Sequence, residues 1–206
     1  MIKARQTPFF VRFFNWYSRR MIKTHFHEVR FHNKPEKTDS PLLVIANHFS
    51  WWDGFFIVYY NRLFFKKKFF VMMLEEQLKN RLFLNKAGAF SIKKNAPSAI
   101  DSLKYAGELI SDPEHLLLMF PQGRIQSQHL CSFQFEKGIE IILRNSSLQP
   151  EILFVANITE YYSQKKPSLD VYFEKPDISS KNYEQIESLY NSFFSSCIKQ
   201  QKPEEL

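Results

Sequence analysis

The stretch Pro41-Leu42-Leu43-Val44-Ile45-Ala46-Asn47-His48-Phe49-Ser50-Trp51-Trp52-Asp53 joins an apolar run to a histidine and a carboxylate five residues apart. The apolar run predicts a buried strand, and a turn from strand into helix would fold Asp53 back beside His48. A carboxylate that accepts the proton of one imidazole nitrogen leaves the other nitrogen free to deprotonate a hydroxyl. We expect Trp51 and Trp52 to shield this pair from water. The alternative is that Asp53 caps the following helix and His48 is an ordinary loop histidine.

Two further segments carry cations at the ends of short apolar strands. Residues 116–120 run into the turn Pro121-Gln122-Gly123, which predicts Arg124 at the carboxyl end of a strand, where open α/β sheets hold ligands. In the segment 86–94, Gly88 permits close approach of the backbone, and two lysines follow the strand. Each segment also has a plainer interpretation. Pro121-Gln122-Gly123 can be only a surface turn, and the two lysines that follow the strand in 86–94 can be only a solvated charged face.

In this order, the three segments resemble the motifs of the glycerolipid acyltransferase superfamily, which includes the 1-acyl-glycerol-3-phosphate acyltransferases. That family carries Asn-His-x4-Asp, then a Gly-x-x-Phe-like segment ending in arginine, then Phe-Pro-Glu-Gly-Thr-Arg-Ser. The first motif matches completely and the others loosely, and the resemblance spans residues 41–176. It implies transfer of an acyl group from acyl-CoA or acyl carrier protein, with His48 as general base and Asp53 as its orienting group. It requires no cofactor and no metal.

The departures from the family pattern fall on residues that hold the acceptor. Gln122 stands where the family has glutamate, Arg124-Ile125-Gln126 replaces Thr-Arg-Ser, and Lys94 replaces an arginine. Arginine binds phosphate through two parallel hydrogen bonds from its planar guanidinium group. Lysine acts as a point charge, so it is less selective for the geometry of the bound anion. The resemblance implies substrate binding by Gly88, Lys94, Gln122, Gly123 and Arg124.

The net charge of +7 lies entirely in residues 1–38, which hold nine Lys or Arg and two Glu. Residues 39–206 hold 19 basic and 19 acidic side chains and are neutral. Such asymmetry is typical of an interaction arm. We therefore expect a basic, aromatic, membrane-interface arm over 1–38 and one acyltransferase domain over 39–206.

Within the arm, Thr7-Pro8 is a good helix start, and aromatic residues follow at spacings of one, three and four. Aromatic rings favour the headgroup region of a membrane, and neighbouring cations add attraction to an anionic leaflet. The alternative is a helix docked on the protein's own core. The residues that we expect to contact lipid are Phe9, Phe10, Arg12, Phe13, Phe14, Trp16, Arg19 and Arg20.

Other features limit the remaining function classes. No stretch reaches the roughly 20 apolar residues that cross a bilayer, and no signal-peptide pattern is present, so we expect a peripheral protein at the cytoplasmic face of a membrane. Cys131 and Cys197 lack a metal-type spacing, and His25, His27 and His32 are expected to face solvent. A nucleic-acid partner would leave His48, Asp53 and Arg124 unexplained. The sequence does not encode the oligomeric state.

Hydrophobic periodicity predicts a single α/β domain with a mostly parallel mixed sheet flanked by helices, plus an N-terminal amphipathic helical arm. Strands are expected near 41–46, 69–73, 88–92, 115–120, 151–158 and 169–174, and helices near 7–22, 53–61, 97–110, 133–144 and 181–200.

The expected function is a membrane-associated O-acyltransferase acting on a lysophospholipid such as 1-acylglycerol-3-phosphate. Its first alternative is the same chemistry on a lipid acceptor without glycerol phosphate, such as a glycosylated pigment or an aminoacyl lipid. The second is a non-catalytic peripheral membrane-binding protein.

Overall fold

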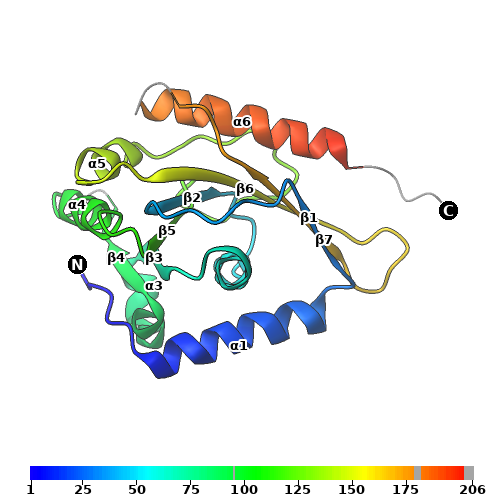
Figure 1. The fold of residues 1–206 in the computed structure, drawn as a ribbon, viewed down its shortest axis with the longest axis horizontal. Coiled ribbons are helices and arrows are strands. Elements are labelled where there is room, and N and C mark those ends of the chain that lie inside the picture. Colours follow the sequence, from blue (N-terminus) through cyan, green and yellow to red (C-terminus); the bar gives the residue numbers. More distant parts are fainter. Residues whose placement is uncertain (95, 179–181, 202–206) are drawn as a thin grey trace.

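The computed structural model describes residues 1–94, 96–178 and 182–201, and it has the expected α/β fold (Figure 1). Seven strands form one mixed sheet in the order β1-β7-β6-β2-β5-β3-β4. All six strands predicted from the sequence are present, and β1 is an additional one. The strands are β1 (Val29–His32), β2 (Leu42–Ala46), β3 (Lys68–Leu74), β4 (Ala89–Ile92), β5 (His115–Met119), β6 (Glu151–Glu160) and β7 (Ser168–Glu174).

Helices cover both faces of this sheet, with α6 on one side and α1 on the other in Figure 1. Three short helical segments, α3, η1 and η2, were not predicted. The helix expected from position 181 begins at Tyr183 in the described residues, and position 181 itself lies outside them. The helical segments are α1 (Pro8–His25), α2 (Asp53–Tyr60), the π-helical η1 (Asn61–Phe65), α3 (Glu75–Lys79), the 3-10 segment η2 (Leu82–Ala87), α4 (Ala99–Leu109), α5 (Ile139–Arg144) and α6 (Tyr183–Gln200).

The order of the strands brings the sequence motifs together. Strands β6, β2, β5, β3 and β4 are mutually parallel, so their carboxyl ends lie along one edge of the sheet. Because β2 pairs directly with β5, the loop that follows Ala46 lies beside the loop that follows Met119. Ligands of open parallel sheets bind at this edge.

Alternation along the strands builds one core on each face of the sheet. Leu43 and Ile45 pack with residues of α4, α5 and α6, whereas Leu42 and Val44 pack with α1 and α2. Strand β2 is completely buried, as expected for a central strand of a parallel sheet covered on both faces.

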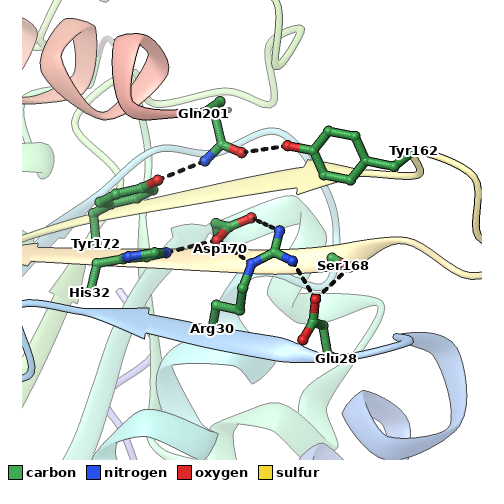
Figure 2. Close-up of polar contacts among 8 residues, drawn as sticks. All are labelled: Glu28, Arg30, His32, Tyr162, Ser168, Asp170, Tyr172 and Gln201. Carbon is green, nitrogen blue, oxygen red and sulfur yellow. Dashed lines mark hydrogen bonds and ion pairs between the residues drawn. The ribbon is translucent and has the colours of Figure 1, made fainter. Parts of the chain in front are cut away.

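Strand β1 lies within the segment that we expected to be an arm. It pairs in parallel with β7, which is itself antiparallel to β6. Figure 2 shows why it is attached there: Arg30 and His32 both bond the carboxylate of Asp170, which is only 3% exposed. His32, which was expected to face solvent, has a side chain that is 36% exposed, and its ring also bonds Asp170.

The helix predicted over 133–144 is wrong in its first half, because the helix α5 begins only at Ile139. Phe133 and Phe135 are buried outside any helix, and side chains of α6 satisfy their backbone. The Phe133 amide donates to Asn191 Oδ1 at 2.7 Å, and the Phe135 amide donates to Glu187 Oε2 at 2.5 Å. These long-range bonds replace the i to i−4 bonds of a helix.

Candidate active site

His48 and Asp53 form the pair that their spacing predicts. Nδ1 of His48 lies 2.7 Å from Oδ2 of Asp53. The Asp53 side chain is fully buried, and the His48 side chain is 20% exposed. Because a carboxylate only accepts, the hydrogen bond assigns the proton to Nδ1 and leaves Nε2 as the basic atom. One imidazole nitrogen is thus available for proton transfer.

Asp53 is fixed by the turn that leads from β2 into α2. Its Oδ2 also accepts from the Phe49 and Ser50 amides at 2.7 and 2.9 Å, and its Oδ1 accepts from Ser50 Oγ at 2.9 Å. Four donors therefore compensate the burial of this carboxylate. Asp53 is the first residue of α2, and its side chain bonds the preceding turn rather than the free amides of the helix, so it orients His48 without capping α2.

Gln122 holds the backbone of His48 rather than a substrate. Its Oε1 accepts from the His48 amide at 2.7 Å, and its Nε2 donates to Gln126 Oε1 at 2.7 Å. The Gln126 amide in turn donates to the His48 carbonyl at 2.9 Å. Gln122 is 4% exposed and does not line the cavity described below. The substrate-binding role implied for Gln122 is corrected to a positioning role, because its amide is occupied by the protein.

The ring that lies against His48 is Phe120, for which no sequence motif indicates a role. The two ring centroids are 4.1 Å apart, and the planes are inclined by 10°. The tryptophans expected to shield the pair have other neighbours. Trp52 stacks on His25, and the Arg81 guanidinium lies 4.5 Å from the centre of the Trp51 ring. Phe120 reaches His48 because β5 pairs with β2.

Hydrogen bonds between Asn47 and Asn157 connect the end of β2 to β6. Nδ2 of the Asn47 side chain donates to the Asn157 carbonyl, and the Asn157 backbone amide donates to Asn47 Oδ1, both at 2.8 Å. The Tyr60 hydroxyl donates to Asn157 Oδ1 at 2.9 Å. Burial raises the pKa of Tyr60 well above its ordinary value, and the negative charge of Asp53 adds to this. Tyr60 is therefore a neutral donor. Its contact with residue 157 was not visible in the sequence.

His48 lines a cavity of about 1050 Å³ that contains many apolar side chains of α1, α2 and β3. Its lining also includes Lys94, Gly123 and Arg124, for which the family resemblance implies substrate binding. At the opposite, amino end of β3, the lining consists of cations: Arg62, Lys66, Lys67 and Lys68. The cavity thus joins an apolar interior to positively charged ends.

Gly88 has a structural role and does not line this cavity. Its φ of +115° is in the left-handed region, and a Cβ at this position would lie 2.0 Å from the Phe69 carbonyl oxygen. The predicted close approach of the backbone is therefore confirmed, but the approaching group is strand β3. The implied contact between Gly88 and a substrate is not made by this geometry.

Helix α1 presents two different faces. Phe14 is 6% exposed and packs against Phe55 and Phe83, with centroids 5.9 and 6.1 Å away. Phe9 and Trp16 are 71% and 56% exposed. The expected lipid contact is therefore wrong for Phe14, which belongs to the core, whereas Phe9, Arg12, Phe13, Trp16, Arg19 and Arg20 remain on the outer face. Phe10 lies between the two faces and is partly buried.

None of the helices in the described part of the chain has the length and apolar character needed to cross a membrane.

The same fold occurs in a protein of known structure. The computed structure resembles the crystal structure of the 1-acyl-sn-glycerophosphate acyltransferase PlsC from Thermotoga maritima, with a TM-score of 0.63 at 15% sequence identity. The similarity covers 94% of this chain and 81% of that one. A search of curated protein sequences found no match. The sequence model of the acyltransferase family matches residues 28–156, more than half of the chain and including the segments that carry His48, Lys94 and Arg124, and the chain therefore belongs to the acyltransferase family.

Proposed function

We propose that this protein is a membrane-associated O-acyltransferase that moves a fatty acyl group from an acyl thioester to a hydroxyl of a lysophospholipid such as 1-acylglycerol-3-phosphate. The observation that carries the proposal is the bond between His48 and the buried Asp53 on the wall of a large, partly apolar cavity. The acyl group comes from acyl-CoA or acyl carrier protein.

In this mechanism, Nε2 of His48 removes the proton of the acceptor hydroxyl as its oxygen attacks the thioester carbonyl. Asp53 accepts from Nδ1 and stabilises the imidazolium that forms. Collapse of the tetrahedral intermediate breaks the carbon–sulfur bond, and the imidazolium returns its proton to the thiolate. The acyl group passes directly to the acceptor, and no covalent bond to the protein is formed.

The cavity supports substrates that have both an apolar chain and an anionic group. Its volume of about 1050 Å³ is at the upper end of the range for ligand cavities. A cavity of this size accommodates a long acyl chain. Arg124 lines it and has no ion-pair partner among the described residues, so its guanidinium is free to bind an anion. We assign this anion to the acceptor.

The outer face of α1 supports binding to a membrane surface. It combines the exposed rings of Phe9, Phe13 and Trp16 with the exposed cations Arg12 and Arg19. Amphipathic helices with this composition lie in the membrane interface, where insoluble acceptors are found. Location at the cytoplasmic face stays a prediction.

The deciding experiment measures release of thiol from palmitoyl-CoA by the purified protein, with and without lysophosphatidic acid. His48→Ala should lower the acceptor-dependent rate by at least about 10³-fold, because it removes the imidazole that takes the proton. His129→Ala is the matched control, since His129 is exposed and does not line the cavity.

Full activity in His48→Ala with a native circular dichroism spectrum would contradict the mechanism. If thiol release depends on His48 but not on lysophosphatidic acid, the chemistry stands and the acceptor is a different lipid. If neither acyl-CoA nor acyl carrier protein supports any release, the protein is a membrane-binding protein without this activity.

A further inference from the structure

An ion pair lies in the part of the cavity that Pro121 and Gly123 line. Nζ of Lys94 lies 2.7 Å from Oε1 of Glu136, although the two residues are 42 positions apart in the chain. Lys94 follows β4 and Glu136 precedes α5. Both side chains line the same cavity as His48. Lys94, which the family pattern makes an anion-binding residue, thus already has a carboxylate partner.

The turn between β5 and α5 is shaped to hold this pair. Gly123 has a φ of +62°, and a Cβ at this position would lie 2.6 Å from Lys94 Nζ and 3.1 Å from Glu136 Cγ. The Glu136 amide donates to the Pro121 carbonyl at 2.8 Å. A Cβ here would require the flexible end of Lys94 to move, and the positive φ strains any residue that has a side chain. Gly123 therefore provides the space in which lysine and glutamate meet.

Glu136 lies among three cations, Lys94, Arg124 and Lys137, which line this part of the cavity and are called the rim below. The Lys94 and Glu136 side chains are 37% and 59% exposed, and pairs in such surroundings contribute little to stability and exchange partners easily. A bound ligand can therefore replace each half of the pair.

We propose that this rim selects an acceptor lipid whose headgroup carries a protonated amine as well as an anion. The anionic group binds between Arg124 and Lys94, and the ammonium group takes the place of Lys94 on Glu136. A headgroup with only negative charge would draw Lys94 away from Glu136, bring a charge of the same sign close to this carboxylate, and supply no cation in the place of Lys94. An amine supplies the missing partner. The inference rests on the proposed acyl transfer and names the acceptor class of the same site.

The test compares lysophosphatidylethanolamine, which carries phosphate and amine, with lysophosphatidic acid, which carries phosphate alone. The ratio of their kcat/KM values, with palmitoyl-CoA as donor, is measured for the wild type and for Glu136→Gln. We expect the wild type to favour the amine-bearing acceptor and the ratio to fall about tenfold in the variant. Glu108→Gln is the matched control, because Glu108 is exposed on α4 and does not line the cavity, and it should leave the ratio unchanged.

A second measurement does not depend on turnover. The same two lipids are titrated against the intrinsic tryptophan fluorescence of the protein, to which Trp51 in the cavity wall contributes, and the ratio of their Kd values is compared between wild type and Glu136→Gln. A ratio of kcat/KM or of Kd that Glu136→Gln leaves unchanged overturns the inference. Absence of thiol release with both acceptors contradicts the proposed function, and the Kd ratio then decides the inference on its own.

Discussion

The backbone of His48 is held on both sides by residues from the loop after β5. Its amide donates to the Gln122 side chain, and its carbonyl accepts from the Gln126 amide. The side chains of these two glutamines also bond each other. A general base must be held within a few tenths of an ångström of its productive position. The pair of glutamines therefore fixes the backbone that carries the His48 imidazole.

Gln122→Ala should lower kcat by about 10- to 100-fold and leave KM nearly unchanged, because it removes the acceptor of the His48 amide but no group in the cavity. Gln122→Glu keeps an acceptor at this position and should recover part of the lost kcat. Steady-state kinetics of the two variants check this prediction. A change confined to KM would instead assign Gln122 to substrate binding, as the family resemblance implied.

At the scale of elements, α1 is both a core helix and an exposed surface. Phe14, Met21 and Ile22 are buried, and Phe9, Phe13 and Trp16 are exposed on the same helix. The close sequence spacing of the aromatic residues indicated one broad stripe. Contact with α2 and η2 divides the stripe, because Phe14 stacks on Phe83. The two faces can therefore be tested separately by neighbouring substitutions.

Phe14→Ala should lower the free energy of unfolding by about 3 kcal/mol, since it opens a cavity where a buried aromatic ring packs. Phe13→Ala should change it by less than about 0.5 kcal/mol, because Phe13 is 41% exposed, and should weaken binding to anionic vesicles. Urea unfolding and vesicle co-sedimentation of both variants measure the two effects. The assignment of faces fails if Phe14→Ala affects vesicle binding alone.

At the scale of the whole molecule, a polar network joins three segments that are distant in the chain. Arg30 and His32 of β1 bond Asp170 of β7, and the ring of His32 stacks on Tyr172 at 4.2 Å. The Tyr172 hydroxyl accepts from Gln201, at the end of α6 (Figure 2). This network fastens the N-terminal region to the edge of the sheet. The chain between α1 and β2 is thus part of the domain.

The network makes stability depend on pH. Burial opposes ionisation of Asp170, but the bonds from Arg30 and His32 outweigh it and hold the pKa of Asp170 below its ordinary value. Its stabilising contribution is therefore present above the unfolded pKa of about 3.9 and is lost as the pH falls below it. Asp170→Asn should lower the free energy of unfolding at pH 7 by about 1–3 kcal/mol, because it removes bonds to charged donors.

Urea unfolding of wild type and Asp170→Asn from pH 7 to pH 3 tests this dependence. The difference between the two proteins should narrow as the pH falls, since protonation of Asp170 imitates the substitution. A difference that is constant over the whole range would show that the charge of Asp170 does not stabilise the fold.

Much of the fold and the centre of the site follow from local sequence. The central strands are continuous apolar runs, and the five-residue spacing of His48 and Asp53 is closed by a single turn of backbone. Strand β1 gave no such signal, since it has four residues and owes its place to pairing with β7. The first half of the helix predicted over 133–144 failed because bonds from α6 overrode the local pattern.

The sequence by itself thus determined the α/β architecture and the pairing of His48 with Asp53, because these depend on periodicity and on contacts a few residues apart. Only the tertiary structure decided what surrounds them: Phe120 on the imidazole, Gln122 on its backbone and Glu136 on Lys94. These partners come from segments at least 42 residues away. Their contact is set by the order of the strands in the sheet, and no local pattern of residues records that order.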